Sequence, residues 1–201
     1  MASHEKSERV RQQIITATDN LLYHKGYNLM SFSDIAAASG IPRGNLNYHF
    51  RTKQEVLTAV IEYRLQHMQE MLDDWQQTIH TPLERLKRYA KVPLNEIDNA
   101  NRYGCPMGSL NTELGKQQPR LQDISRKQFD LFRNWLQQQF HALLPDQDSD
   151  NLAMHLLVRT QGLAIMAQSY ADQSLLKREV EGIKIWLDSL VNDTHADVNS
   201  K

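Results

Sequence analysis

The sequence lacks the features that mark secreted, membrane-spanning or disulfide-stabilised chains. Among its 201 residues there is one cysteine, Cys105, so no disulfide can form within the chain and a zinc site built from several cysteines is excluded. No apolar run approaches the roughly 18 residues that span a bilayer, and the first residues lack the apolar stretch of a secretory signal. We therefore expect a cytoplasmic protein that has no membrane partner.

An excess of charge of either sign is also absent. The formal net charge of -1 gives no general attraction to nucleic acid or to an anionic membrane. Charge can still be local, and within residues 31–54 Asp34 alone opposes Arg43, Arg51 and Lys53. The sequence therefore allows a small basic face near the N-terminus.

Apolar residues spaced three and four apart occur almost throughout, and sustained alternation does not. This period predicts an all-α fold of about nine helices. The expected helices run over residues 7–25, 32–39 and 43–50, from Lys53 to about Ile79, from Pro82 with a kink at Pro93, over 106–114, from Pro119 to a break at Pro145, and over 150–171 and 174–192. Capping boxes are expected at Ser31 with Asp34 and at Thr52 with Glu55.

Two of the short helices lie on either side of Gly40, Ile41 and Pro42, a spacing typical of a helix-turn-helix. The second helix of such a motif enters the DNA major groove. Apolar side chains of both helices are expected to pack underneath, namely Phe32, Ile35, Ala36, Ile41, Leu46 and Phe50. The second helix then presents polar groups that suit base edges and phosphates.

The predicted DNA contacts combine that helix with two neighbouring helix N-termini, where free N–H groups favour phosphate. The residues are Ser31, Ser33, Arg43, Gly44, Asn45, Asn47, Tyr48, His49, Thr52 and Lys53. A structural alternative stays open for Asn45, Asn47, Tyr48 and His49, because surface amides and packed aromatic or histidine residues are common in helical proteins.

The segment from Ile14 to Leu57 resembles the DNA-binding domain of the TetR/AcrR family of bacterial transcriptional repressors. The resemblance rests on Lys25-Gly26-Tyr27, on Ser31-Phe32-Ser33-Asp34-Ile35-Ala36, on Ser39-Gly40-Ile41, and on Arg43 to Phe50 followed by Thr52-Lys53. It implies an N-terminal domain that binds operator DNA and a larger C-terminal domain that dimerises and accepts a small-molecule inducer. We accordingly predict a helix-turn-helix domain over 1–52, a ligand-binding and dimerisation domain over 53–193, and a disordered tail over 194–201.

Two positions depart from the family's pattern. Pro42 stands where a Ser or Thr commonly caps the recognition helix, so a phosphate contact from that side chain is absent. Asn47 stands where an aromatic residue is common, and an amide there favours contact with a base edge. The operator sequence therefore does not transfer from relatives.

The last two predicted helices are apolar over broad faces. The resemblance implies that they meet a twofold mate in a four-helix bundle, and such a dimer would place two recognition helices about 34 Å apart. The predicted dimerisation residues are Leu152, Leu156, Ile165, Val180, Ile183, Leu187 and Leu190. The alternative is that these faces are buried within one chain.

The middle helices are the expected place for an inducer. Residues that could line the cavity are Met68, Met71, Trp75, Tyr89, Cys105, Met107, Phe129, Phe132 and Met166. Their chemistry suits a fairly hydrophobic small molecule, although ordinary core packing explains the same residues.

Cys105 precedes Pro106, which fits the first position of a helix. Helix N–H groups there favour a thiolate, so the thiol is a candidate for reaction with oxidants or electrophiles, as in some members of the family that the chain resembles. The alternative is that Cys105 is a small packing residue.

These observations predict a homodimeric repressor that an inducer, or modification of Cys105, releases from DNA. Two alternatives stay open, a DNA-binding protein without an inducer and a helical enzyme. The sequence holds no HExxH, P-loop, GxSxG or CxxC motif, so we predict no catalytic residue, no metal and no cofactor.

Overall fold

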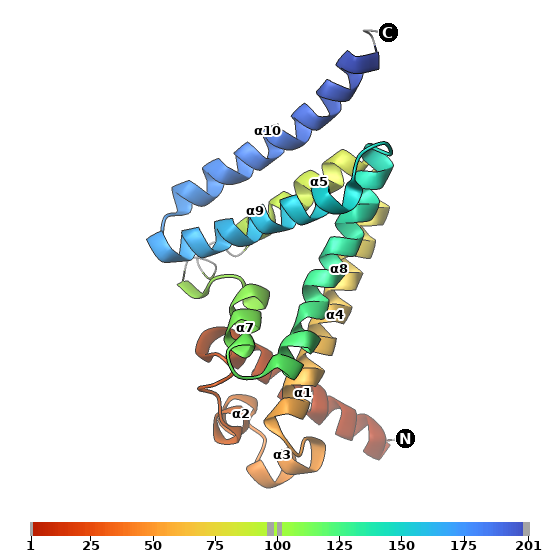
Figure 1. Ribbon diagram of the computed structural model, residues 1–201. Coiled ribbons are helices and arrows are strands. Elements are labelled where there is room, and N and C mark those ends of the chain that lie inside the picture. Colours follow the sequence, from red (N-terminus) through yellow and green to blue (C-terminus); the bar gives the residue numbers. More distant parts are fainter. Residues whose placement is uncertain (1, 96–98, 100–101, 199–201) are drawn as a thin grey trace. The chain divides into compact units, whose positions relative to one another are not determined.

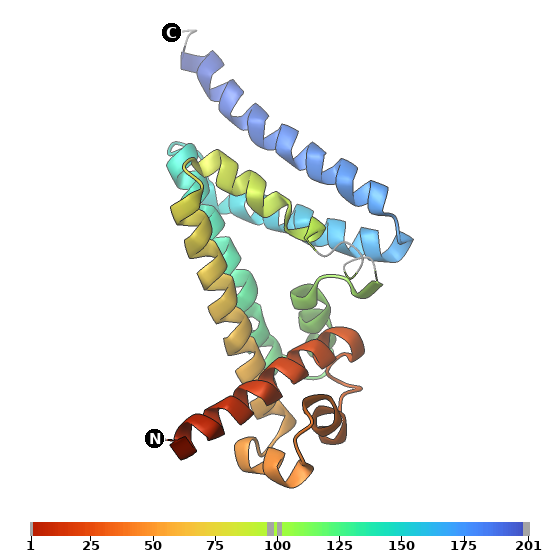
Figure 2. The ribbon, with the colours of Figure 1, turned by 180° about the vertical axis from the view of Figure 1, so that it is seen from behind.

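The computed structural model describes the backbone of residues 2–95, 99 and 102–198, and the side chains of 4–95, 99 and 102–192. In this part of the chain helices dominate and no strand occurs, which confirms the all-α prediction (Figures 1 and 2). The elements are α1 (Ala2–Lys25), α2 (Phe32–Ser39), α3 (Arg43–His49), α4 (Lys53–Thr78), α5 (Pro82–Ala90), the 3-10 turn η1 (Val92–Leu94), α7 (Pro106–Gly115), α8 (Pro119–Leu143), α9 (Ser149–Tyr170) and α10 (Gln173–Val198). None of these helices is long and apolar enough to cross a membrane.

The predicted capping box at Ser31 is complete, whereas the one at Thr52 is only partial. At α2 the backbone N–H of Asp34 donates to Ser31 Oγ, and the backbone N–H of Ser31 donates to the Asp34 carboxylate. At α4 the N–H of Glu55 donates to Thr52 Oγ1, while the Glu55 carboxylate accepts the N–H of Arg51. The second box therefore closes one residue earlier than the ideal pattern.

Two helices are longer than the sequence predicts. α1 begins at Ala2 rather than Ser7, and α10 continues to Val198, into the predicted tail; residues 199–201 lie outside the described part. Once a helix exists, each further residue adds a backbone hydrogen bond, so a helix can extend beyond the apolar residues from which the sequence predicts it. The helix predicted from Pro82 ends at Ala90, and Pro93 lies in η1.

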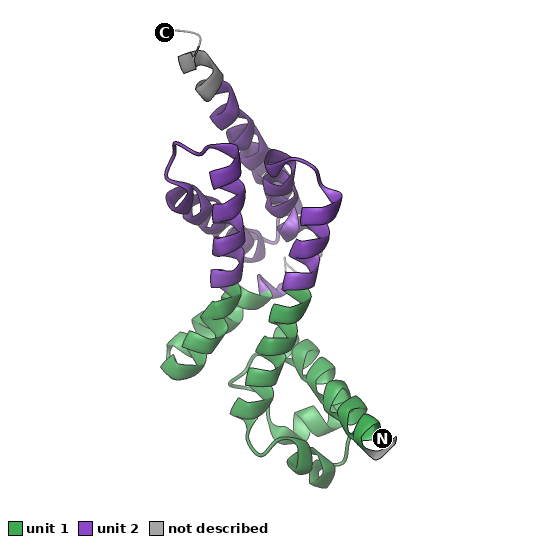
Figure 3. Cartoon of the chain, turned by 90° about the vertical axis from the view of Figure 1, so that its right-hand side faces the viewer, with its two compact units in different colours: residues 1–68, 106–128 green, residues 69–105, 129–201 purple. Residues whose placement is uncertain are grey.

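The chain forms two compact units, drawn in different colours in Figure 3. Unit 1 holds residues 1–68 and 106–128, and unit 2 holds 69–105 and 129–201. Leu110 and Leu114 of α7 and Leu121 of α8 belong to the same apolar cluster as Ile14 and Leu46. The compact unit around the helix-turn-helix is therefore larger than residues 1–52, because α7 and the first part of α8 complete its core.

Unit 2 is built around an aromatic core between α4, α5 and α8. The rings of Trp75 and Trp135 lie edge to face at 5.9 Å, and those of Tyr89 and Phe132 at 5.1 Å. α5 and α9 also pack against α10, which buries Leu156, Val180, Ile183 and Leu187.

Candidate nucleic-acid interface

One side chain anchors α3, and the rest of the helix is free of the core. Leu46 is completely buried, and Phe50, immediately after the helix, is buried as well. Arg43, Asn45 and Asn47 are exposed. This arrangement fixes the helix through its underside and leaves its polar face open to a partner.

The aromatic end of α3 completes this polar face. Tyr48 is 82% exposed, and its ring contacts that of the half-buried His49 at 5.2 Å. Gly44 is exposed, and a Cβ at this position would meet no atom within 4 Å. The predicted outward face of residues 43–48 is therefore the exposed face of the helix, and His49 lies at its edge.

The turn before α3 is held by hydrogen bonds rather than by a cap. Gly40 adopts a left-handed φ of 67°, which suits glycine, and ends α2. Ser39 is buried: its hydroxyl donates to Ile35 O, and its carbonyl accepts a bond from the Gln13 side chain at 2.7 Å. As predicted, Pro42 makes no side-chain cap, so the orientation of α3 depends on this turn and on Leu46.

Ser31 and Thr52 are exposed at the N-termini of α2 and α4, and Ser33 is exposed on α2. The hydroxyls of Ser31 and Thr52 already accept backbone N–H groups. Asp34 pairs with Lys25 at 2.8 Å, and this contact, with bonds from Ser31, lowers the pKa of Asp34 to about 2. The Asp34 carboxylate is therefore ionised at neutral pH, and the Lys25 ammonium offsets its charge.

The ammonium of Lys53 is bound to backbone carbonyls of the protein itself. Its ammonium donates to Tyr27 O at 2.9 Å and Met30 O at 3.0 Å and lies 4.2 Å from the Tyr27 ring centroid. An ammonium has three donors, so at most one remains for a phosphate. The structure assigns Lys53 mainly to holding the turn between α1 and α2.

Two arginines that the sequence analysis missed lie beside this surface. A hollow of about 650 Å³ in unit 1 is lined by Arg11 and Arg120 together with His49 and Thr52. Arg11 stacks on the Phe50 ring at 5.0 Å, and Arg120 comes from α8, far away in sequence. Glu55 and Glu62 line the same hollow, so its charges are mixed.

The residues predicted to line an inducer cavity do not share one compact unit. Met68 and Met107 belong to unit 1, and the others belong to unit 2. In unit 2 Trp75, Tyr89 and Phe132 are buried in the aromatic core, Met71, Cys105 and Phe129 are half-buried, and Met166 is exposed on α9.

Polar atoms within the aromatic core of unit 2 are few. The Tyr89 hydroxyl lies 3.4 Å from Thr160 Oγ1, and burial raises the pKa of Tyr89 well above its usual range. The indole Nε1 of Trp135, which the sequence analysis did not select, is buried without a hydrogen-bond partner among the described residues. It is a free donor inside an apolar environment.

The single thiol lies where the chain enters α7. Gly104 has a left-handed φ of 75°, Cys105 is half-buried, and α7 begins at Pro106 as predicted. Cys105 lies close enough to Tyr89 to add, after burial, to the raised pKa of that phenol. Arg102 stacks on the ring of Tyr103 at 5.2 Å.

Burial divides the seven predicted dimerisation residues. Leu156, Val180, Ile183 and Leu187 are buried within the chain. Leu152 and Leu190 are half-buried, and Ile165 is 58% exposed. The exposed apolar side chains of these two helices are instead Met154, Val158, Ile165, Met166 and Tyr170 on α9 and Ile185 on α10.

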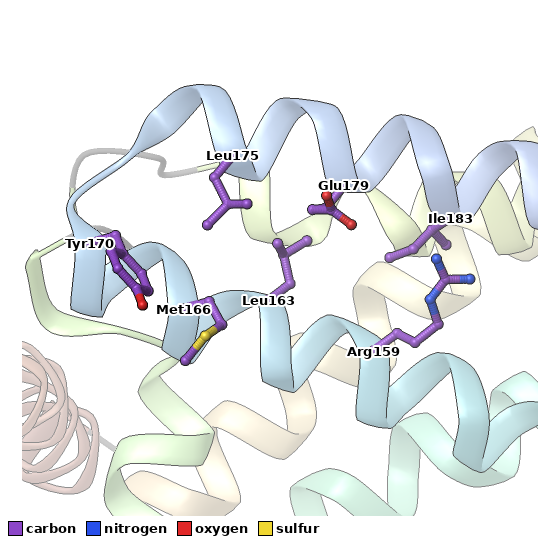
Figure 4. Close-up of a pocket in the computed structure, with 7 residues that line it drawn as sticks. All are labelled: Arg159, Leu163, Met166, Tyr170, Leu175, Glu179 and Ile183. Carbon is purple, nitrogen blue, oxygen red and sulfur yellow. The ribbon is translucent and has the colours of Figure 1, made fainter.

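A groove of about 410 Å³ runs along the seam between α9 and α10 (Figure 4). Leu163 points into it from α9, and Leu175 and Ile183 point into it from α10. Arg159 and Glu179 supply opposite charges on its two sides, and Tyr170 lies at the end nearest the turn between the helices.

A short helix with a buried underside and an exposed polar face, joined by a tight turn to a second helix, is the geometry of a helix-turn-helix, a motif typical of DNA-binding proteins. Comparison with known proteins gives the family. Residues 14–60 match the family described as bacterial regulatory proteins, tetR family.

Curated relatives agree over most of the chain. An HTH-type transcriptional regulator of Lactococcus lactis subsp. lactis, itself uncharacterised, is 27% identical over 87% of this chain and 91% of its own length. The transcriptional repressor DhaR of Mycobacterium sp. (strain GP1) is 25% identical over 73% of this chain and 72% of its own.

Solved structures share the fold. A TetR transcriptional regulator from Legionella pneumophila superimposes with a TM-score of 0.75 at 24% identity, covering 89% of this chain and 95% of that one. Another from Chloroflexus aurantiacus J-10-FL gives 0.80 at 20% identity, covering 92% and 96%. The segment 14–60 belongs to the tetR family, and with such relatives over most of its length the chain is a DNA-binding transcriptional regulator with a helix-turn-helix.

Proposed function

We propose that the protein is a homodimeric repressor that binds a twofold operator and is released from it by a small molecule or by modification of Cys105. The exposed polar face of α3 over the buried Leu46 is the observation that carries the proposal. It offers an arginine and two asparagines, the side chains that bond guanine and adenine edges in the major groove. The name of the related repressor DhaR supports repression as the outcome.

The exposed apolar side chains of α9 and α10 support a dimer. Val158 and Ile185 are 60% and 69% exposed, and Ile165 lies on α9 seven residues after Val158. Because helix positions seven apart share a face, Val158 and Ile165 form a stripe that a second copy would cover. We propose this stripe, with Met154 and Ile185, as the dimer interface, in place of the four buried residues.

A twofold dimer sets the spacing of the two half-sites in the operator. Two recognition helices about 34 Å apart contact half-sites separated by one turn of DNA. A protein with so little net positive charge gains little from attraction to phosphates and would bind a single half-site weakly. Binding to the second half-site is therefore required for useful affinity.

The aromatic core of unit 2 is the proposed site of inducer binding. Trp75, Tyr89 and Phe132 suit a hydrophobic molecule, and the free donor Trp135 Nε1 suits one that carries a hydrogen-bond acceptor. Modification of Cys105 is the second proposed route of release from DNA. The thiol is half-buried near Tyr89, so only small oxidants or electrophiles can reach it.

Selection of bound fragments from random DNA tests the proposal. The full chain is expected to enrich an inverted repeat whose half-sites lie about 10 base pairs apart, and peroxide or candidate inducers are expected to release it. Cys105→Ser separates the two routes, since only the response to peroxide should disappear. Absence of any enriched sequence would contradict the function, and enrichment of a single half-site would contradict the dimer.

A further inference from the structure

A carboxylate of α7 is bound to the turn that joins α1 and α2. Glu113 Oε2 accepts the backbone N–H of Tyr27 at 2.9 Å, and Glu113 Oε1 accepts that of Asn28 at 2.7 Å. These residues belong to unit 1, the green part of Figure 3. Hydrogen bonds to an ionised acceptor are stronger than neutral ones, so one side chain fixes two consecutive residues of the turn.

Gly26 leaves room for this contact. It ends α1 with a left-handed φ of 80°, a conformation that side chains rarely adopt. A Cβ at this position would lie 3.0 Å from Glu113 Oε2. Glycine therefore suits the backbone conformation, and a side chain at this position would also displace the Glu113 carboxylate slightly.

Lys53 holds the same turn from α4. The Lys53 ammonium donates to the carbonyls of Tyr27 and Met30. The negative Glu113 therefore binds the N–H groups of the turn, and the positive Lys53 binds its carbonyls. Burial lowers the pKa of Lys53, and the attraction of Glu113 opposes this effect. The two side chains act on the turn together.

α7 is also fixed at its first residue. Arg64 of α4 donates to Pro106 O at 3.3 Å and pairs with Asp19 of α1 at 2.6 Å. Leu110 and Leu114 bury the underside of α7 in the core of unit 1. α7 is therefore a firm support for the Glu113 carboxylate.

The turn leads directly into the part of the molecule that faces DNA. Met30 is followed by Ser31, which caps α2, and α2 packs on α1 and α3. A displacement of residues 27–30 would therefore shift the start of α2 and the support of α3.

We propose that Glu113 is a positioning residue for DNA recognition, which by holding the Tyr27–Asn28 turn sets the orientation of α2 and α3 required for specific binding. This inference rests on the proposed function. It gives α7, which lies outside the helix-turn-helix segment, a part in operator specificity.

Glu113→Gln tests the proposal because electrostatics and positioning predict opposite results. Removing a negative charge should strengthen binding to any DNA. Loss of the Glu113 contact should instead weaken binding to the selected operator by about tenfold while non-specific binding is unchanged or tighter. Glu8→Gln is the matched control, since it removes the same charge from an exposed position of α1 in unit 1, outside the hollow beside α3, and should alter both affinities alike.

Amide hydrogen exchange at Tyr27 and Asn28 measures the contact itself. Faster exchange together with a lower ratio of specific to non-specific affinity supports the proposal, and faster exchange with an unchanged ratio overturns it. General destabilisation lowers both affinities through the folded fraction, so it leaves the ratio unaltered.

Glu113→Asp keeps the charge and shortens the side chain by one methylene. It is expected to give a smaller loss of the ratio than Glu113→Gln, and it serves as the test if the glutamine variant does not fold. A ratio equal to that of the unmodified protein would overturn the proposal. If the unmodified protein binds no operator, the proposed function and this inference both fail, whereas an operator-binding protein insensitive to Glu113 overturns this inference alone.

Discussion

The two regions that face proposed partners are built in different ways. α3 has seven residues and one buried side chain, Leu46, so the remaining polar residues are exposed almost by necessity. α9 and α10 are long and apolar on several sides, and the chain itself covers one of these sides. A short helix with a single anchor has one possible outer face, whereas a long apolar helix has several, and only its neighbours decide which one is free.

The largest effect is expected where a charge is placed on the apolar stripe of α9. Ile165→Glu or Val158→Glu should dissociate the proposed dimer, since a charge buried without a partner costs several kcal/mol and the twofold places two of them in the interface. Analytical ultracentrifugation measures the mass, and circular dichroism shows whether the helices persist.

Leu29→Glu is the control for the dimer experiment. Leu29 is also an exposed apolar side chain, but it lies in the turn between α1 and α2. This variant should keep the mass of the unmodified protein. A stripe variant that remains dimeric would show that the interface lies elsewhere.

A smaller effect, on the stability of unit 1, is expected when the buried side chain beneath α3 is shortened. Leu46→Ala should lower the free energy of unfolding of unit 1 by about 2–5 kcal/mol, because it removes a fully buried side chain and leaves a cavity. Tyr48→Ala, two residues away and exposed, should change stability by less than about 0.5 kcal/mol while weakening DNA binding. Urea unfolding and DNA titration measure the two effects. Equal destabilisation by both substitutions would contradict the one-anchor description of the helix.

Substitutions in the exposed polar face of α3 are expected to cost less binding free energy than Leu46→Ala costs in stability. Asn47→Ala should cost about 1–3 kcal/mol at one operator position and relax the preference there. Arg51→Ala, at an exposed arginine before α4, should weaken binding to all sequences alike and reduce the salt slope by about 1. Binding measured on operators with single base changes separates the two. Uniform loss for both variants would refute a base contact from Asn47.

The smallest effect concerns acid pH. Because the folded pKa of Asp34 is about 2 and its usual value is 3.8, its ionised form stabilises the fold above the usual value, and this stabilisation is lost as the pH falls toward 2. Asp34→Asn should lower the unfolding midpoint at neutral pH and flatten its dependence on acid pH. Urea unfolding midpoints measured from neutral pH down toward pH 2 give this pH dependence of stability. A variant whose midpoint still falls as steeply in acid would exclude Asp34 as the source of the dependence.

The local signals of the sequence were sufficient for much of the proposed DNA-contact region. Ser31 with Asp34, Thr52 with Glu55, Gly40 and Pro42 act on neighbouring residues, so their helix ends follow from chemistry within a few positions. The exposed face of α3 followed in the same way from its one apolar residue.

Contacts between distant segments were not accessible to that reasoning. Lys53 is basic and follows a capping residue, which favours a phosphate ligand, yet its ammonium is bound by carbonyls more than twenty residues earlier. Glu113 carries no signal in its own neighbourhood, because the N–H groups that it binds are 85 and 86 residues away.

The sequence by itself determined that the chain is helical, the helix ends on either side of the turn at Gly40 and the exposed face of α3, because hydrogen bonds and side-chain periods within a helix involve residues only a few positions apart. Tertiary structure decided which apolar stripe of α9 and α10 stays open, where Lys53 points, and that α7 supports the turn before α2. All three features depend on which segments meet in space. A side chain is buried only where two segments pack together, and the sequence of one helix does not identify the other segment.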